Sequence, residues 1–460
     1  MSGFAKRYNH AHLVGIGGVG MAGLARVLHG QGVRVTGSDI ASSNALADLA
    51  TDGFEVYVGH AAVQLGEADL LVYSAAVSED NVELAAAAER GIDCASRAQV
   101  LGAMSRERRT AAIAGTHGKT TSAAMVADIL QRADWQPDIL VGGEVDGRIR
   151  ASVGRGEWLV VEADEYARSF LELYPEVALI TCVEADHLDC YTGIIEVEQA
   201  FVAFLQRMPF YSVALLGGDG LVSQRVVEAA GRRVLTFGQL AGNDYQIVDV
   251  VLDAWSSRFG LRYAGDALVD IELGVPGIHN VRNAAGAVAL AHQFGVDMAC
   301  CRAALAQFRS VDRRFQLRGD VGDVRVVDDY AHHPSEVAAA LATARASGRR
   351  IVAVFQPHLY SRTRDFADAF ARALAEADRV VLAAIYPARE TPIAGVDATL
   401  IERALRGIGY DEVDYVEDGT ALVSHVINVC RPGDIVLTMG AGDIGQLAGL
   451  LVKMLERVAR

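Results

Sequence analysis

The stretch from residue 12 to residue 39, HLVGIGGVGMAGLARVLHGQGVRVTGSD, contains the pattern that decides the fold. A short apolar run that ends at Val14 is followed by a cluster of glycines and by an Ala- and Leu-rich segment with helical spacing. A second apolar run then ends at Asp39. An apolar run, a glycine turn, a helix and another apolar run are typical of the β-α-β unit of a parallel sheet. The stretch therefore predicts an α/β fold.

Two further blocks of the chain show the same alternation of apolar runs and helical stretches. One restarts with the strand-like residues 110–114, after a charged cluster, and the other begins near Gly319. Between about residues 235 and 275, apolar and polar residues alternate instead, which indicates an antiparallel patch attached to the second block.

We therefore predict three α/β domains, which agrees with 460 residues at roughly 150 per domain. The first is a Rossmann-like domain over residues 1–108. The second is a central P-loop-type ATPase domain with a mostly parallel sheet, over residues 109–315. The third is a C-terminal Rossmann-like α/β domain over residues 316–460.

The composition excludes several classes of protein. Hydrophobic residues make up 51% of the chain and charged residues 22%, so it can bury enough apolar surface to fold without disulfides. The net charge of -16 repels nucleic acids and anionic membranes. The six cysteines have no metal-ligand spacing, which is typical of reduced thiols, and no apolar run is long enough to span a bilayer. We expect a soluble cytoplasmic protein with no nucleic-acid or membrane partner.

The glycine cluster Gly15–Gly20 matches the GxGxxG pattern between a strand and a helix, and Asp39 lies 19 residues after Gly20. Glycines allow a diphosphate to approach the backbone at the helix N-terminus, while a carboxylate after the second strand can bind ribose or base. The pattern predicts a nucleotide site but does not distinguish NAD from other diphosphates. A glycine turn that serves only packing is the structural alternative.

A second glycine loop, Gly115–Thr121 (GTHGKTT), also lies between a predicted strand and a helix. Ile113 stands where the full Walker pattern has its first glycine. The chain has only three lysines, and Lys119 in this loop is the one far from both ends. An ammonium group can follow the β- and γ-phosphates of a nucleotide, and the next residue, Thr120, is placed to bind Mg²⁺. We predict a phosphate loop rather than a turn with a solvated lysine.

Acidic residues follow two of the predicted strands of the second block. Residues 162–165 (EADE) follow one strand, and residues 184–189 (EADHLD) follow another. The carboxyl ends of parallel strands are where α/β sheets bind ligands, and carboxylate oxygens suit Mg²⁺. Next to a phosphate loop these clusters predict a two-metal or a metal-plus-base site. Each cluster alone is also compatible with a solvated loop.

Further candidate residues lie in the last part of the chain. Asn280 and Asn283 open a predicted helix, and their amides suit either an adenine edge or a helix cap. Residues 328–334 (DDYAHHP) follow the first strand of the third block, and we interpret their two histidines as substrate or nucleotide contacts rather than as a metal pair. Residues 355–364 (FQPHLYSRTR) supply basic groups suited to a carboxylate.

The order of these motifs over essentially the whole chain resembles that of the Mur ligase family. The resemblance implies that the first domain binds a UDP-sugar, the second ATP and Mg²⁺, and the third an amino acid and part of the nucleotide. It implies an ATP-dependent ligase that joins L-alanine to the carboxylate of UDP-N-acetylmuramate through an acyl phosphate, in peptidoglycan precursor synthesis. A monomer or weak homodimer is expected.

The resemblance also implies a role for individual residues. Contacts to the UDP-sugar are expected from Gly17, Gly18, Val19, Gly20, Ser38 and Asp39. ATP contacts are expected from Gly115, Thr116, His117, Gly118, Lys119, Thr120, Thr121, Asn280, Asn283, Arg314 and Asp329. Mg²⁺ ligands are expected to be Thr120, Glu162 and His187, and the amino-acid pocket Tyr330, His332 and Arg362. The catalytic set is Lys119, Glu162, His187, His332 and Arg362.

Three alternatives stay open at this point. The run EADEYAR at residues 162–168 is similar to that of a sister ligase that attaches a recycled tripeptide to the same UDP-sugar, although GIGGVGM favours alanine. A dehydrogenase explains GxGxxG but not GTHGKTT. A non-catalytic nucleotide-binding protein explains neither the lysine with its acidic neighbours nor the candidate third-domain pocket. Cys182 and Leu359 depart from residues that are common in the family.

Overall fold

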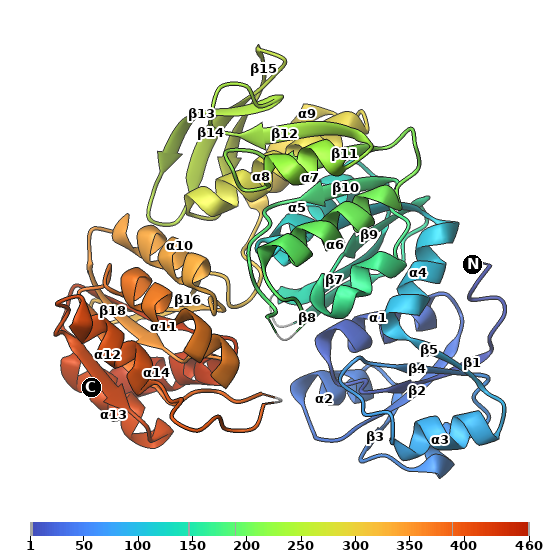
Figure 1. Ribbon diagram of the computed structural model, residues 1–460, viewed down its shortest axis with the longest axis horizontal. Helices are drawn as coiled ribbons and strands as arrows, with labels where there is room; N and C mark the ends of the chain where they lie inside the picture. The colour runs from blue at the N-terminus through green and yellow to red at the C-terminus, as the bar shows by residue number, and fades with distance from the viewer. Residues whose placement is uncertain (1–2, 146–147, 189, 389, 459–460) are drawn as a thin grey trace. The chain divides into compact units, whose positions relative to one another are not determined.

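A computed structural model of the chain describes residues 3–145, 148–188, 190–388 and 390–458 (Figure 1). The chain forms two compact units. Unit 1 comprises residues 1–249, 260–271 and 282–308, and unit 2 comprises residues 250–259, 272–281 and 309–460. The described residues form sheets of five, ten and six strands. The predicted fold class, three α/β domains with mostly parallel sheets, is confirmed.

The first sheet has the strand order β3-β2-β1-β4-β5, and each pair of neighbours is parallel. This order is that of a Rossmann-like sheet whose connections are helices on its faces. The central strand β1 (HAHLV) is buried throughout, and its two histidines each form a hydrogen bond with Thr36, at 2.9 Å for His10 and 2.8 Å for His12. The strands are β1 (His10–Val14), β2 (Arg34–Asp39), β3 (Glu55–Val58), β4 (Leu70–Tyr73) and β5 (Asp93–Ser96), and the helices are α1 (Val19–Gly30), α2 (Asn44–Thr51), η1 (Ala62–Leu65), α3 (Val82–Glu89) and α4 (Arg97–Glu107).

The second sheet has the order β15-β14-β13-β12-β11-β10-β6-β9-β7-β8, with parallel pairs from β13 to β7. Strands β13 to β15 are consecutive neighbours joined by short turns, which only antiparallel strands permit. The predicted antiparallel patch is therefore confirmed for these three strands, whereas β12, at the start of the predicted range, pairs parallel with β13. The strands are β6 (Arg109–Ala114), β7 (Asp138–Val145), β8 (Arg148–Ser152), β9 (Trp158–Glu162), β10 (Val177–Ile180), β11 (Val213–Gly217), β12 (Arg233–Gly238), β13 (Tyr245–Leu252), β14 (Ser257–Tyr263) and β15 (Asp266–Leu273). The helices are α5 (Lys119–Arg132), η2 (Tyr166–Glu172), α6 (Ile194–Gln206), α7 (Gln224–Ala229), α8 (Ile278–Gln293) and α9 (Met298–Gln307).

The third sheet has the order β16-β17-β21-β18-β19-β20, and only the β16–β17 pair is antiparallel. Alternate residues of its central strands pack into two separate apolar clusters, one on each face, so these strands are apolar throughout. The strands are β16 (Gln316–Val321), β17 (Val324–Asp329), β18 (Arg350–Phe355), β19 (Arg379–Ala383), β20 (Val413–Val416) and β21 (Asp434–Met439). The helices are α10 (Pro334–Arg345), α11 (Tyr360–Leu374), α12 (Thr399–Gly407), α13 (Gly419–Val429) and α14 (Ile444–Val458).

None of the helices formed by the described residues combines the length and the hydropathy that crossing a bilayer requires.

A buried carboxylate, Asp138 at the start of β7, connects the first two sheets within unit 1. It accepts hydrogen bonds from the backbone N–H of Gly154 at 2.8 Å and from Gln31, just after α1, at 3.4 Å. The Arg108 guanidinium, between the two sheets in sequence, lies 3.3 Å away. The Asp138 side chain is fully buried, and burial raises its pKa. Three segments therefore depend on one carboxylate.

We predict that Asp138→Ala lowers the free energy of unfolding of unit 1 by about 2 to 4 kcal/mol, because Arg108 and the Gly154 N–H then lose their acceptor. The measurement is the first transition in urea-induced unfolding. The matched control is Asp52→Ala, which removes an exposed ion pair with Arg26 and costs about 1 kcal/mol or less. Equal losses in the two variants would contradict the role of Asp138.

Candidate active site

The loop between β6 and α5 has the backbone geometry of a phosphate loop. Gly115 and Gly118 have φ values of 129° and 79°, which favour glycine. A Cβ atom on Gly115 would lie 2.1 Å from the Thr181 hydroxyl, so a larger residue does not fit. No side chain caps the N-terminus of α5, which leaves the N–H groups of its first turn available to an anion. The predicted residues Gly115–Thr121 thus form one cradle.

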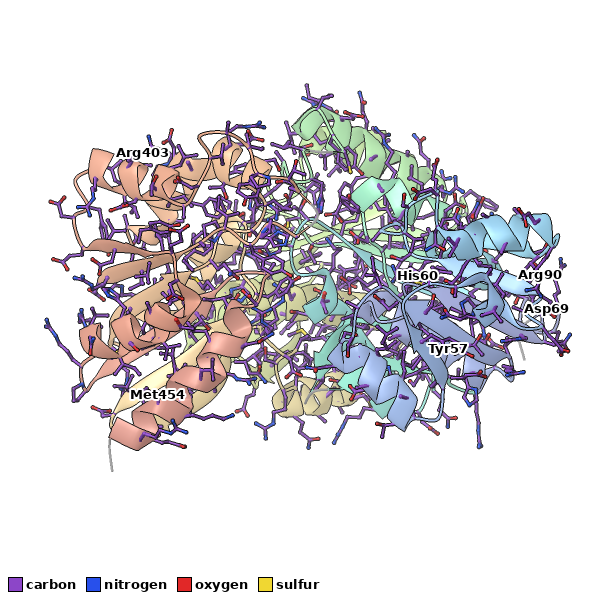
Figure 2. The ribbon with its side chains drawn as sticks, turned by 90° about the horizontal axis from the view of Figure 1, so that it is seen from below. Tyr57, His60, Asp69, Arg90, Arg403 and Met454 are labelled. Carbon is purple, nitrogen blue, oxygen red and sulfur yellow. The ribbon has the colours of Figure 1, made fainter. Side chains whose placement is uncertain are left out.

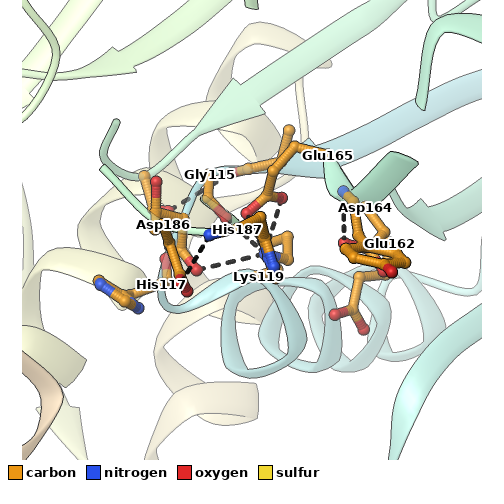
Figure 3. Close-up of polar contacts among 12 residues, drawn as sticks. Gly115, His117, Lys119, Glu162, Asp164, Glu165, Asp186 and His187 are labelled. Carbon is orange, nitrogen blue, oxygen red and sulfur yellow. Dashed lines mark hydrogen bonds and ion pairs between the residues drawn. The ribbon is translucent and has the colours of Figure 1, made fainter. Parts of the chain in front are cut away.

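Lys119 is held in this cradle by three groups (Figure 3). Its Nζ atom donates to the Gly115 carbonyl at 2.8 Å, to the Thr116 carbonyl at 3.2 Å and to Glu165 at 2.8 and 3.0 Å. The Lys119 and Glu165 side chains are only 13% and 2% exposed. Burial acts to lower the pKa of Lys119, but the charges of Glu165 and Asp164 outweigh it, so this pKa is raised. The ammonium is therefore charged at any physiological pH.

The residue after the lysine faces a different carboxylate. The Thr120 hydroxyl donates to Glu162 at 2.9 Å, and the Gly142 N–H of β7 donates to the other Glu162 oxygen at 2.8 Å. Glu162 is the last residue of β9, at the carboxyl edge of the parallel sheet. A hydroxyl and a carboxylate at this distance form the oxygen pair that Mg²⁺ prefers. Two of the three predicted metal ligands thus lie together.

The third predicted ligand, His187, follows β10 and lies beside Glu165. Its Nε2 atom is 3.6 Å from the Glu165 carboxylate, and Asp164, Glu165 and His187 each have a possible ligand atom within 4.8 Å of the others. Burial opposes protonation of His187, but the Glu165 and Asp186 carboxylates raise its pKa. Glu165 was predicted only as the third acid of the EADE cluster, without a role of its own. Asp189, in the second cluster, lies outside the described residues.

Asn283 of α8 approaches the phosphate loop, whereas the side chain of Asn280 is engaged elsewhere. A Cβ atom on Gly118 would lie 2.5 Å from the Asn283 side-chain oxygen. The Asn280 side-chain amide instead donates to the Pro276 carbonyl at 2.7 Å, just before the helix begins. The structure thus gives Asn280 a local structural contact and places Asn283 at the loop.

In the first sheet, the glycine loop lies against Asp39 at the end of β2. The Gly17 N–H donates to the Asp39 carboxylate at 2.9 Å, and Gly15 has a φ value of 80°. Gly18 precedes α1, which also has no side-chain cap, so N–H groups at Val19 and Gly20 are available. The candidate UDP-sugar residues on this loop and Asp39 therefore form one group.

Ser38 points the other way, into a buried polar network. Its hydroxyl donates to Glu83 at 2.5 Å and lies 2.9 Å from His60. His60 is labelled in Figure 2. Glu83 is fully buried and also lies 3.4 Å from His12. Burial acts to raise the pKa of Glu83, but contacts from His12 and Ser38 lower it. The Ser38 side chain is thus held by Glu83, while the Ser38 carbonyl accepts hydrogen bonds from the N–H groups of Gly15 and Ile16 in the loop. No periodicity in the sequence indicated Glu83.

The nucleotide residues predicted in unit 2 meet at the end of β17. The Asp329 carboxylate accepts the N–H groups of Phe315 at 2.8 Å and Ala331 at 2.7 Å. Burial raises the pKa of Asp329 to about 7. The Arg314 guanidinium lies 5.3 Å from the centre of the Tyr330 ring and 3.5 Å from Glu336. Asp329 therefore fixes the backbone at Phe315 and Ala331, the residues that directly follow Arg314 and Tyr330.

The residues predicted for the amino-acid pocket lie near neighbouring strand ends of unit 2. His332 lies 2.9 Å from the Tyr330 carbonyl through Nδ1, and its ring centre is 5.9 Å from that of His358. The buried Arg362 contacts His358 at 3.3 Å. His358 stacks on Tyr386, which follows β19 and was not among the predicted residues. This group of residues thus combines one buried guanidinium with aromatic and imidazole rings.

Comparison with known proteins extends over nearly the whole chain. The chain matches three family models. Residues 10–109 match the model described as "Mur ligase family, catalytic domain", residues 113–291 match "Mur ligase middle domain", and residues 313–442 match "Mur ligase, glutamate ligase domain". The chain is 44% identical to the UDP-N-acetylmuramate--L-alanine ligase of Thermobifida fusca (strain YX), over 98% of this chain and 97% of the relative.

Solved structures show the same likeness. The UDP-N-acetylmuramate-alanine ligase from Thermotoga maritima has a TM-score of 0.81 at 29% identity, covering 98% of this chain and 99% of that one. A murein peptide ligase from Psychrobacter arcticus has a TM-score of 0.71 at 24% identity, covering 97% and 98%, and shares the fold.

We predict a pH dependence of stability that arises from Asp329. Its pKa is about 7 in the folded chain and near 4 when unfolded, so between these values only the folded chain keeps the proton. The contribution of Asp329 to the free energy of unfolding is therefore full below pH 4 and is lost as the pH rises to about 7, by on the order of 4 kcal/mol.

The measurement is urea-induced unfolding at several pH values, for the wild type and for Asp329→Asn. The difference between the two should decline between pH 4 and 7 and stay level above that. Asp320→Asn, which removes a partly exposed ion pair with Arg325, serves as the control without this decline. Parallel profiles for wild type and Asp329→Asn would show that Asp329 does not titrate in this range.

Proposed function

Because the chain belongs to the Mur ligase family, we propose that it is an ATP-dependent ligase that joins L-alanine to the carboxylate of UDP-N-acetylmuramate. The observation that carries the proposal is 44% identity, over nearly full length, to a ligase with that name. A second relative with the same name is 40% identical over 97% of this chain, which favours alanine over a recycled tripeptide. The product is a peptidoglycan precursor, which we place in the cytoplasm, made by a monomer or weak homodimer.

The reaction has two steps. The muramate carboxylate attacks the γ-phosphorus of ATP, which breaks the bond to the β-phosphate oxygen and gives an acyl phosphate and ADP. The amine of alanine then attacks the acyl carbon, and phosphate leaves as the amide bond forms. The amine loses a proton in this second step. The first step brings two anions together, so a fixed positive charge at that point lowers its barrier.

Lys119 supplies this charge. Its ammonium lies at the start of α5, among carbonyls and next to Glu165, so it is charged and held in place before the nucleotide arrives. A preorganised charge needs no reorganisation during the reaction, which is why such groups are effective in catalysis. The uncapped N–H groups of α5 bind phosphate oxygens in the same cradle.

The residues present suit a divalent cation. We propose that Thr120 and Glu162 hold one Mg²⁺ and that His187, with Glu165 and Asp164 nearby, holds a second. Their oxygen and imidazole donors fit this role, because carboxylates and hydroxyls are hard ligands. Mg²⁺ when bound neutralises negative charge on the phosphates and on the attacking carboxylate.

In unit 2, we propose that Arg362 binds the carboxylate of alanine while Tyr330 and His332 line its pocket. Arg362 is buried beside His358, which limits the directions its guanidinium can take. A guanidinium matches a carboxylate with two parallel hydrogen bonds. Arg314 and Asp329 are proposed as nucleotide contacts, and Asp329 acts by holding the backbone at Phe315 and Ala331.

We expect phosphate release from ATP and Mg²⁺ only when both UDP-N-acetylmuramate and L-alanine are present. The comparison amine is the tripeptide L-Ala-γ-D-Glu-meso-diaminopimelate, in a coupled phosphate assay. In the presence of UDP-N-acetylmuramate, release with L-alanine but not with the tripeptide supports the proposal. Release with the tripeptide but not with L-alanine would move the protein to the recycling ligases, and release with neither amine would contradict ligase activity.

A second prediction concerns Lys119, whose removal leaves Glu165 buried without its main partner. Lys119→Met should lower turnover at least ~100-fold, because a preorganised charge is lost. It should also lower stability, whereas the double variant Lys119→Met with Glu165→Gln should recover stability but not turnover. The exposed Lys453 on α14 offers the matched control, since Lys453→Met should keep both. Full activity of Lys119→Met would contradict the role of the loop.

A further inference from the structure

Arg97 occupies an unusual position beside the first glycine loop. It is the first residue of α4, directly after β5 and the capping residue Ser96. A Cβ atom on Gly20 would lie 2.8 Å from the Arg97 Cζ atom and 2.9 Å from its Nε and Nη2 atoms. Gly20 has no positive φ, so the backbone does not require glycine here. The space that glycine leaves at position 20 is filled by the guanidinium.

The hydrogen-bonding capacity of Arg97 is not used within the described part of the chain. Its Nε atom is buried and has no hydrogen-bond partner, and Arg97 forms no ion pair there. By contrast, Arg26 and Arg34 in the same domain pair with Asp52 and Glu55 at 2.8 and 2.9 Å. A guanidinium has five N–H donors, and burying it without an acceptor is unfavourable. Such a group is suited to an anion that arrives from outside.

The surroundings indicate which anion. Arg97 lies against the loop whose N–H groups, at the uncapped start of α1, suit a diphosphate. It also senses the charges of Glu162 and Asp164 in the second sheet of the same unit, although neither pairs with it. Arg97 therefore lies against the glycine loop and within electrostatic range of two carboxylates at the proposed Mg²⁺ residues.

We propose that Arg97 binds an anionic group of the sugar nucleotide beside the first glycine loop. This group is either the diphosphate or the muramyl carboxylate of the sugar nucleotide. The inference rests on the proposed function. Phosphate and carboxylate oxygens both match the planar fork of a guanidinium, with two parallel hydrogen bonds. Arg97 thereby orients the substrate so that its carboxylate can reach the phosphate loop.

The test measures binding by calorimetry for Arg97→Met, with Arg34→Met as the control that removes one charge from the same domain. The ligands are UDP-N-acetylmuramate, UDP-N-acetylglucosamine, which lacks the carboxylate, UDP and, separately, ATP. Arg97→Met should weaken binding of UDP-N-acetylmuramate by ~10- to 100-fold, while ATP binding and the control change less than ~2-fold. A loss shared by all three uridine ligands assigns Arg97 to the diphosphate. A loss confined to UDP-N-acetylmuramate assigns it to the carboxylate.

Unchanged binding of all uridine ligands to Arg97→Met, or a loss of ATP binding instead, overturns the inference. If the wild type binds none of the uridine ligands, the proposed function fails as well, so the two failures are distinguishable. Should Arg97→Met fold poorly, Arg97→Lys and rescue of Arg97→Ala by millimolar guanidinium provide the same readout. In kinetics, the KM for UDP-N-acetylmuramate should rise in Arg97→Lys while the KM for ATP stays unchanged.

A double-mutant cycle separates this role from packing. Gly20→Ala places a methyl group where the guanidinium lies, so it should displace Arg97 and weaken UDP-N-acetylmuramate binding. In the Arg97→Met background the same change should have a much smaller effect, because there is no guanidinium to displace. Fully additive losses would show that Gly20 and Arg97 act independently and would overturn the inference.

Discussion

The buried ion pair between Lys119 and Glu165 is the interaction on which the candidate active site depends. It fixes the ammonium between the Gly115 and Thr116 carbonyls, and it ties the end of β9 to the start of α5. Glu165 also lies beside His187 from the next strand end. One carboxylate thus organises three segments. Because the pair is nearly solvent-free, water screens its charges only weakly.

The same physical arrangement occurs twice in unit 1. A buried parallel strand leads into a glycine loop, and the loop leads into a helix with no side-chain cap, at α1 and again at α5. In each case a carboxylate from a neighbouring strand lies at the loop, Asp39 at the first and Glu162 at the second. The first loop has a half-buried arginine close by, whose Nε atom is buried, and the second has a nearly buried lysine. We propose that two such loops on one unit bind two anionic reactants and present one to the other.

Local patterns predicted the parts of the fold and the site that depend on neighbours in sequence. Glycine loops, strand ends and apolar runs are of this kind, so both loops, the acidic strand ends and the antiparallel patch could be predicted. Glu83, Tyr386 and the partner role of Glu165 depend on contacts between distant segments, and no spacing indicates them. Lys119 was predicted from the glycine loop, but its near-complete burial depends on Glu165, which follows β9. Ser38 stays a predicted substrate contact, and its hydrogen bond to Glu83 could not be predicted from the sequence.

Gly20 shows why a motif alone underdetermines a site. Within GxGxxG, this glycine is usually explained by the close approach of a ligand or by packing of the helix on the sheet. Here a third reason applies, because the absent side chain leaves room for the Arg97 guanidinium, 77 residues further along the chain. The glycine and the arginine form one feature. A sequence pattern records only the glycine, whereas the fold shows that it admits a positive charge to the loop.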